Sequence, residues 1–422
     1  MVTSTANEEG SNHPGVARAA RAPLSESLPL IPSGRVNRPS DVRYFDLRAG
    51  VRQLCEHFPG EYWREMDRKR SYPEAFVRAV TDAGYLGALV PAQYGGLGLG
   101  VSEASIIFEE INRSGGNSAP VHAQMYTMAV LLRHGSDSQK QQYLPGIAAG
   151  TLRLQAFAVT EPNAGSDSTR IQTTAVRHHD TYVVNGQKVF TSRAQQSDLL
   201  LLLARTAPRD EKAKRSAGLS LFLIDLRDCE PGRLVIKPLE TMVNHHTNEL
   251  FFENLKIPEQ SLLGKEGEGF RYVLDTMNAE RILIAAECIG DGRWFVDRAS
   301  SYARERNVFG QAIGRNQGIQ FPIARAHVAT EAADLMRWQA AQMFDNGEPC
   351  GGEANMAKLL AADASWEAAN VAMQTLGGYG FATEYDVERK FRETRLYQIA
   401  PISTNLILAS VAAHILSLPR SY

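Results

Sequence analysis

The pattern of hydrophobic and polar positions changes its period twice along the chain. From Asp41 to Gly150 apolar residues recur at the spacing of one helical face, and from Phe270 onward they do so again. Between Leu152 and Pro258 they gather instead in short runs typical of strands. The order predicts an α+β fold with an N-terminal all-helical domain at 41–150, a central antiparallel β domain at 151–260 and a C-terminal helical domain at 261–422.

The central region contains a strong signal for a tight turn. Asn185-Gly186 stands between two β-prone runs within Tyr182–Phe190. Because both central residues of a two-residue turn need positive φ, this pair predicts a hairpin. Further apolar runs predict strands at Leu199–Leu203, Leu219–Leu226, Leu234–Leu239 and Glu249–Leu255.

Residues 1–40 differ in composition from the rest of the chain. They hold five prolines, six serines and no aromatic residue, so they cannot bury enough apolar surface to offset the entropy of ordering. We expect a disordered tail. No apolar run in it resembles the core of a signal peptide, so an export or transit role has little support.

The charge balance disfavours two classes of function. The chain has 45 Lys and Arg against 47 Asp and Glu, a formal net charge of −2. Nucleic-acid binders carry a basic excess and binders of anionic membranes a basic patch. The longest apolar runs fall far short of the ~20 residues that cross a bilayer. We therefore expect neither a nucleic-acid partner nor a membrane span.

Cysteine and histidine spacing points away from metal and disulfide chemistry. Cys55, Cys229, Cys288 and Cys350 form no CxxC pair, which favours reduced thiols and a cytoplasmic location. The pairs His178-His179 and His245-His246 lack the helical spacing that places two histidines on one metal. The fingerprints GxGxxG, GxSxG and HExxH and the Walker loop are missing too.

One segment, Phe157–Asp167, has the features of a ligand-binding turn. A short β-prone run is followed by small residues whose N–H groups and hydroxyls suit a phosphate or the polar edge of a flat cofactor. By itself this pattern is equally compatible with an ordinary loop after a strand.

Together with three further blocks, the segment resembles the signature of the acyl-CoA dehydrogenase family. The blocks are Gln187–Ser192, then Arg306–Gly310 with Gln317, then Gln374–Gly378 followed by Arg392 and Ser403. The resemblance runs from about Tyr44 to Tyr422. It implies a C-terminal four-helix bundle, bound FAD, and desaturation of an acyl-CoA thioester between its α and β carbons. It also implies an electron-transfer flavoprotein as electron acceptor and a homotetramer or homodimer.

The resemblance assigns the cofactor and substrate sites residue by residue. The residues implied to line the flavin are Phe157, Val159, Thr160, Gly165, Ser166, Phe190, Thr191 and Ser192, with Phe190 where most members have tryptophan. A neighbouring subunit would reach the pyrophosphate and adenosine end with Arg306, Phe309, Gln317, Gln374, Leu376, Gly377 and Gly378. A guanidinium fork suits phosphate, although Arg306 alone could form a surface salt bridge. Ser403 and Asn405 complete the implied cofactor set, and Ser166, Asn278, Arg281 and Ile402 form the implied substrate set.

The catalytic base departs from the commonest family pattern. Most members carry it as a glutamate near the C-terminus, where this chain has Pro401. The branch that includes isovaleryl-CoA and long-chain enzymes carries it on a bundle helix before an arginine, which indicates Glu280. Independently, Glu280 adjoins the wholly apolar Ile282–Ala286, where lost solvation raises the pKa of a carboxyl group. A Glu280–Arg281 pair with surface contacts only is the alternative.

Pro401 also removes a backbone donor. In the family, the N–H at this position and a flavin hydroxyl hold the thioester oxygen, and proline has no N–H. Either the N–H of Ile402 takes over, or the reaction is not ordinary desaturation. A flavin oxidase or monooxygenase on the same scaffold is therefore the alternative function. A non-catalytic flavin-containing binding protein is disfavoured by the net charge.

Overall fold

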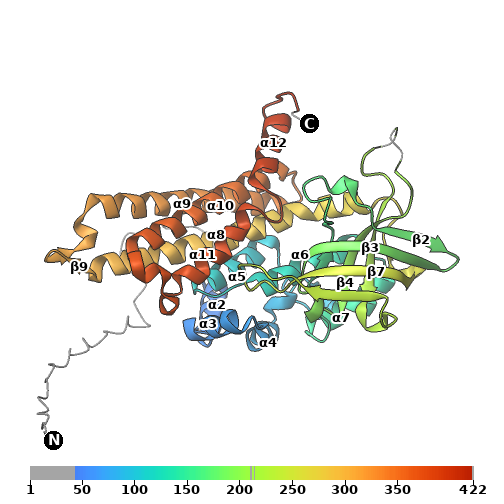
Figure 1. Ribbon diagram of the computed structural model, residues 1–422, viewed down its shortest axis with the longest axis horizontal. Coiled ribbons are helices and arrows are strands. Elements are labelled where there is room, and N and C mark those ends of the chain that lie inside the picture. The colour runs from blue at the N-terminus through green and yellow to red at the C-terminus, as the bar shows by residue number, and fades with distance from the viewer. Residues whose placement is uncertain (1–42, 210–211, 213, 421–422) are drawn as a thin grey trace, which may run out of the picture. The chain divides into compact units, whose positions relative to one another are not determined.

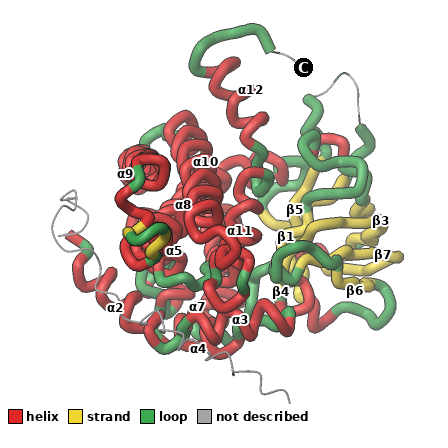
Figure 2. Tube along the Cα trace, turned by 60° about the vertical axis from the view of Figure 1, so that its left-hand side comes forward, coloured by secondary structure: helices red, strands yellow, loops and turns green. Residues whose placement is uncertain are grey.

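The changes of period appear in the structure as helices, then a sheet, then longer helices (Figure 1). The computed structural model describes residues 43–209, 212 and 214–420, so the predicted tail at 1–40 lies outside the described residues. Residues Tyr44–Tyr422 form one compact unit. The tube in Figure 2 shows most helices of this unit on one side and its main sheet on the other.

Six α-helices of the described residues precede the sheet. They are α2 (Phe45–Glu56), α3 (Gly60–Lys69), α4 (Glu74–Asp82), α5 (Val101–Arg113), α6 (Ala119–His134) and α7 (Asp137–Ala148). Helix α5 is buried along most of its length, which explains its dense apolar sequence. Its N-terminus is capped from a distant helix, because Asp345 accepts hydrogen bonds from the N–H groups of Val101 and Ser102 at 2.8 and 2.9 Å.

The central sheet is mixed rather than wholly antiparallel. Its strands are β1 (Ala156–Ala158), β2 (Thr174–His178), β3 (Thr181–Ser192), β4 (Leu199–Arg205), β5 (Leu219–Asp225), β6 (Leu234–Pro238), β7 (Thr247–Pro258) and β8 (Leu262–Leu263). They follow the order β6-β7-β3-β2-β4-β5-β8, and β1 pairs with β4. The pairs β1–β4 and β2–β4 are parallel. The prediction of a purely antiparallel domain was therefore wrong for these two pairs, because the β2–β3 hairpin supplies the long connection that parallel strands need.

The predicted hairpin turn at Asn185-Gly186 was also wrong. Both residues lie inside β3, where the register with β7 shifts between Val184 and Gly186. The chain turns instead between His178 and Thr181, with His179 at a φ of 54°. A Cβ on Gly186 would lie 2.5 Å from Oγ1 of Thr173, so this glycine serves a β-bulge and a close backbone approach.

The C-terminal region is a bundle of four helices with a fifth projecting from it. The bundle contains α8 (Gly269–Glu305), α9 (Gln317–Asp345), α10 (Gly351–Leu376) and α11 (Val387–Arg395), and α12 (Thr404–His414) follows. A ribbon of β9 (Asn307–Val308) and β10 (Gln311–Ala312) joins α8 to α9. The segment Ile282–Ala286 of α8 is buried on every side, which confirms the reading of its all-round apolar sequence.

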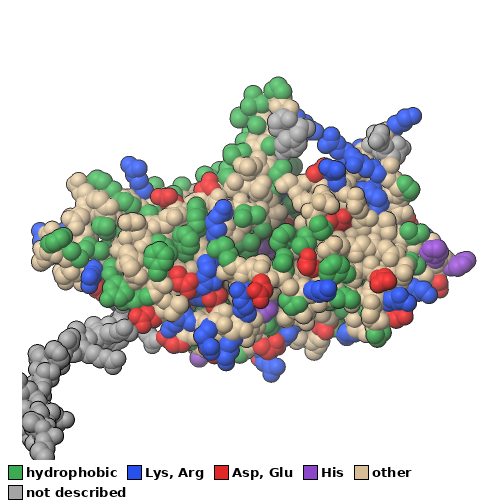
Figure 3. Space-filling model, in the orientation of Figure 1, with side chains coloured by type: hydrophobic (Ala, Val, Ile, Leu, Met, Phe, Trp, Pro, Cys, Tyr) green, Lys and Arg blue, Asp and Glu red, His purple; other side chains and the backbone are tan. Residues whose placement is uncertain are grey.

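Apolar side chains are exposed on the bundle and on α12 (Figure 3). Along α9, Phe321, Val328 and Leu335 are exposed at intervals of seven residues and so share one face. Beyond α12, Ile415, Leu416 and Leu418 are exposed too. Among the described residues, no helix is long and apolar enough to span a membrane.

A cluster of buried charges ties four helices together. Glu109 of α5 accepts hydrogen bonds from Arg48 of α2 at 2.9 and 3.0 Å and from Arg337 of α9 at 3.0 Å. It also pairs with Arg293 of α8, which binds Asp334 at 2.6 Å. Burial alone would raise the pKa of Glu109, but these arginines hold it well below its usual value. We call these five residues the Glu109 cluster.

Candidate active site

A buried ion pair holds the turn after β1 in place. Glu161 and Ala164 exchange two backbone hydrogen bonds, which close a tight turn. The carboxylate of Glu161 accepts N–H bonds from Gln172 and Thr173 and, at 2.9 Å, from Nζ of Lys188 on β3. Burial lowers the pKa of Lys188 to about 8. The turn that carries Gly165 and Ser166 is therefore anchored to the strand that carries Phe190.

The end of β3 presents an aromatic ring and an unsatisfied hydroxyl. The register of β3 shifts between Lys188 and Thr191, and Phe190 takes a φ of 59° with 61% of its surface exposed. Oγ1 of Thr191 is buried without a hydrogen-bond partner among the described residues. An exposed flat ring beside an orphaned hydroxyl fits a planar ligand with polar edges, as a flavin is. Phe157 and Val159 are partly buried nearby, and the N–H of Val189 binds the carbonyl of Thr160 at 2.9 Å.

Glu280 lies on α8 without a fixed partner. Its carboxylate forms no hydrogen bond or ion pair with the residues that the structure describes, and Arg281 instead donates to Asn278 at 2.9 Å. The surface-pair alternative therefore lacks its contact. Burial raises the pKa of Glu280, and the neighbouring His122 and Arg281 lower it by less.

A second carboxylate lies two helical turns further along α8. Glu287 is seven residues after Glu280, so both occupy one helix face. It binds Nδ1 of His122 on α6 at 2.8 Å and accepts a 2.5 Å hydrogen bond from the hydroxyl of Tyr397. Burial alone would raise the pKa of Glu287, but His122 and Tyr397 hold it below its usual value.

Buried Lys358 fastens the loop that contains Pro401. Its Nζ donates to the carbonyls of Tyr397 at 2.6 Å and Ile402 at 2.9 Å. The N–H of Ile402 donates no hydrogen bond to the described residues. Ser403 caps α12 by accepting from the N–H of Leu406, and Asn405 is exposed in the first turn of that helix.

Tyr126 connects the base region to the end of β1. Its ring lies 6.1 Å from that of Phe157 and 5.2 Å from that of His122, measured between centroids. Burial raises the pKa of Tyr126, the charge of Glu280 raises it further, and the charge of Arg193 lowers it. Tyr126 is thus within electrostatic reach of both charged groups.

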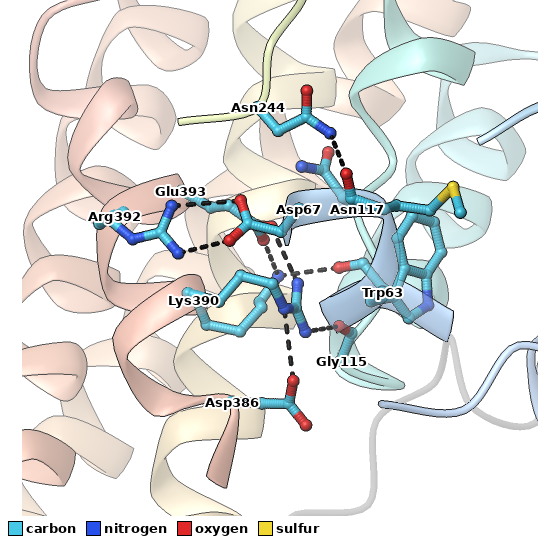
Figure 4. Close-up of polar contacts among 12 residues, drawn as sticks. Trp63, Asp67, Gly115, Asn117, Asn244, Asp386, Lys390, Arg392 and Glu393 are labelled. Atoms are coloured by element: carbon cyan, nitrogen blue, oxygen red, sulfur yellow. Dashed lines mark hydrogen bonds and ion pairs between the residues drawn. The ribbon is translucent and has the colours of Figure 1, made fainter. Parts of the chain in front are cut away.

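Beside this region lies a small cavity lined by apolar and charged residues, some of which Figure 4 shows. Arg193 and His246 line it, together with Asp67 of α3 and Glu393 of α11. Both carboxylates are already paired: Asp67 accepts from Arg392 at 2.6 and 3.2 Å, and Glu393 accepts from Arg389 at 2.8 Å. Their charges are therefore compensated within the protein.

The remaining residues of the implied cofactor site lie at the opposite end of the molecule. Figure 1 shows the ribbon at β9 at the far end of the bundle from β3. Arg306 ends α8, Phe309 is fully exposed with a φ of 51°, and Gln317 begins α9. Gln374, Leu376, Gly377 and Gly378 lie at the end of α10, with Leu376 turned into the core. A single chain does not bring these residues to the turn of Gly165.

Several residues of this region were not predicted as site residues. They are His122, Tyr126, Arg193, Glu287 and Lys358. Two carried a usable signal, since Glu287 interrupts an apolar helix at the spacing of Glu280 and Arg193 directly follows the block ending at Ser192. All four cysteines are free, and the described residues contain no group of His, Cys, Asp and Glu that could hold a metal.

Comparison with known proteins identifies relatives over nearly the whole described chain. Residues 44–151, 156–255 and 267–416 match the profiles of the acyl-CoA dehydrogenase N-terminal, middle and C-terminal domains. An acyl-CoA dehydrogenase of Mycobacterium tuberculosis is 35% identical over 379 residues, covering 89% of this chain and 96% of that protein. A glutaryl-CoA dehydrogenase of Desulfococcus multivorans is 36% identical over 357 residues, covering 82% and 90%. The solved complex of glutaryl-coenzyme A dehydrogenase with glutaryl-CoA aligns with a TM-score of 0.84 at 33% identity, covering 92% of this chain and 98% of that one.

Proposed function

Because the chain belongs to the acyl-CoA dehydrogenase family, an FAD-dependent family of oxidoreductases that act on CH–CH bonds, we propose that Glu280 is the base that removes the α proton of its acyl-CoA substrate. The observation that carries this proposal is the half-buried carboxylate on α8 without a hydrogen-bond partner among the described residues. Its raised pKa brings its basicity closer to working pH. This base position resembles that of the isovaleryl-CoA and long-chain branch.

The residues of the chain divide the remaining tasks. When bound, FAD accepts the hydride that leaves the β carbon of the substrate. Phe190 would cover the flat ring, while Thr191, Ser192 and the turn of Gly165 and Ser166 would bind its polar edge. The free N–H of Ile402, held by Lys358 through its own carbonyl, supplies the donor that Pro401 lacks.

A second copy of the chain would complete the cofactor site. Fully exposed Phe309 and the open glycines Gly377 and Gly378, beside which a Cβ would meet nothing within 4 Å, leave room for a ligand at the far end of the bundle. The exposed apolar face of α9 offers a surface for association. These features support a homotetramer or homodimer.

The electron acceptor and the location are proposed on less specific grounds. We propose an electron-transfer flavoprotein as acceptor, in line with the family. Rapid oxygen consumption and peroxide release during turnover would favour an oxidase instead. Four free cysteines, three of them buried, are consistent with a reducing cytoplasm.

Anaerobic bleaching of the bound flavin by acyl-CoA tests the assignment of the base. Glu280→Gln should keep FAD bound and abolish the bleaching, because the amide cannot accept the α proton. Glu268→Gln is the matched control, since Glu268 lies at the start of the same helix and contacts Arg271 there; it should bleach as the unmodified protein does. Bleaching by Glu280→Gln at the normal rate would refute the proposal.

A further inference from the structure

Arg193 differs from the other buried arginines of the described chain, because its guanidinium has neither a carboxylate nor a backbone carbonyl as a partner. It is 2% exposed, and no Asp or Glu among the described residues lies within ion-pair distance of it. Arg48, Arg293, Arg337 and Arg389 each pair with at least one carboxylate. Arg205 donates to the backbone carbonyls of Ile171, Ala217 and Thr169. Nε of Arg193 has no partner in the described structure.

Hydrogen bonds fix the backbone of Arg193, which limits how far its side chain can move. Its φ is 54°, its N–H donates to the carbonyl of His246 at 2.7 Å, and its carbonyl accepts from Oγ of Ser197 at 2.8 Å. The guanidinium lies 3.4 Å from Nδ1 of His245, measured from Nη2. Because an arginine can only donate, this Nδ1 is an unprotonated acceptor. Burial and the charge of Arg193 lower the pKa of His245 well below its usual value, so the histidine is neutral and compensates no charge.

The groups that interact electrostatically with the guanidinium come from five parts of the fold. They are Tyr72 before α4, Tyr126 on α6, Glu287 on α8 and Tyr397 after α11, with His245 and His246 from the segment before β7. Glu287 is the carboxylate among them, and it already binds His122 and Tyr397. Arg193 is therefore a fixed, buried cation with an unused donor, and its charge acts on Tyr126, on which the charge of Glu280 also acts.

Leaving such a cation without a partner is costly, because burial removes its hydration. A bound carboxylate would supply both the missing charge and an acceptor for Nε, in the paired geometry that guanidinium favours. Resting on the proposed function, we propose that Arg193 binds a carboxylate at the far end of the acyl group, so that the preferred substrates are CoA thioesters of short dicarboxylic acids. Arg193 is thus a specificity-determining residue of the acyl pocket.

A panel of acyl-CoAs matched in length tests this proposal. Succinyl-, glutaryl- and adipyl-CoA would be compared with butyryl-, pentanoyl- and hexanoyl-CoA, and with the terminal amides of the three dicarboxylic thioesters, by anaerobic flavin bleaching and steady-state kinetics. The unmodified protein should show a kcat/KM at least about tenfold higher for one carboxylate than for its monoacid and its amide, since removing the charge loses a desolvated ion pair. A preference for the monoacid at every length would overturn the proposal.

Two variants separate recognition of the substrate from a structural role. Arg193→Met should weaken binding of the preferred carboxylate about 30-fold or more while leaving the matched monoacid within about threefold. Arg193→Lys should retain part of the preference, because it keeps the charge and loses the fork. Equal losses for both substrates, with a shifted flavin spectrum, would assign Arg193 to the flavin and contradict the proposal.

Failure of this proposal differs from failure of the proposed function. If no acyl-CoA of any kind bleaches the flavin, the base assignment fails as well. If monoacids bleach it and carboxylates do not, the assignment of Glu280 stands and that of Arg193 falls. Should Arg193→Met lose its flavin or its fold, the panel on the unmodified protein still decides.

Discussion

Two regions of this molecule bury charged side chains, and they treat them in opposite ways. In the Glu109 cluster each charge finds a partner: Glu109 binds three arginines, and Arg293 and Arg337 also bind Asp334. Around Tyr126, by contrast, the described residues offer Glu280 no partner and Arg193 only a neutral histidine. Both regions lie against α8.

The difference separates structural from reactive charge. A buried ion whose hydrogen bonds are all made holds elements together and keeps its protonation state. A buried ion without partners destabilises the fold. Its shifted pKa can serve catalysis, and its unused hydrogen-bonding groups can bind a ligand. The contrast predicts that substitutions in the first region change stability and those in the second change turnover.

The largest effect is expected from Glu280→Gln. Loss of a general base should lower kcat by roughly 10²–10⁴-fold. Because the amide removes a carboxyl group that is costly to ionise where it lies, thermal stability should stay level or rise. Steady-state kinetics and calorimetry on the same preparation test both expectations, and a large fall in stability would erase the contrast between the regions.

Glu109→Gln should have the opposite effect: it should lower stability and change turnover little. It leaves three buried arginines short of a counter-charge, so the free energy of unfolding should fall by about 3–5 kcal/mol. Flavin bleaching per folded molecule should change little, since the ion-pair partners of Glu109 in the described part of the chain are the arginines that join α2, α8 and α9. Urea denaturation of the holoprotein, beside bleaching assays, measures the two quantities; intact stability would show that the cluster is dispensable.

Activity and stability should respond to acid over different pH ranges. The pKa of Glu280 is raised above the ~4.3 of an ordinary glutamate. Below this raised pKa, kcat/KM should fall about tenfold per unit of pH. The pKa of Glu109 is lowered, so its contribution to stability is complete above the ordinary carboxyl pKa and is lost as pH falls through its folded value. A pH profile of kcat/KM beside an acid-unfolding curve would show this; coincident transitions would argue against it.

An exposed ion pair provides the smallest expected effect. Arg227 and Asp225 form a pair at 2.6 Å in which the arginine is half exposed. Arg227→Ala should change the free energy of unfolding by no more than about 1 kcal/mol, because water screens the pair. Thermal denaturation would check it, and a loss as large as that of Glu109→Gln would show that burial is not what distinguishes the clusters.

Some features followed directly from local sequence. A helix segment made of the five apolar residues Ile282–Ala286 is expected only where protein surrounds the helix. These five residues are buried. The four apolar runs of the central region became strands within a few residues of their predicted bounds. Such features depend on side-chain periodicity, which neighbouring residues in the chain determine.

Other features depended on partners distant in sequence. Asn185-Gly186 has the composition of a turn, yet pairing with β7 and contact with Thr173 make it a bulge within one strand. The anchoring of the turn at Gly165 required Lys188 to reach Glu161. Neither outcome is contained in the local pattern, because each depends on which strands become neighbours.

The sequence by itself thus determined the kinds of elements, their order, and the candidate base beside an apolar helix segment. Only the tertiary structure decided which charges are compensated. An arginine such as Arg293 or Arg193 looks the same in a sequence, and whether a carboxylate lies within a few ångströms depends on how helices from distant parts of the chain pack. Compensation of charge is a property of that packing, and here it distinguishes the residues that hold the fold from those available to a substrate.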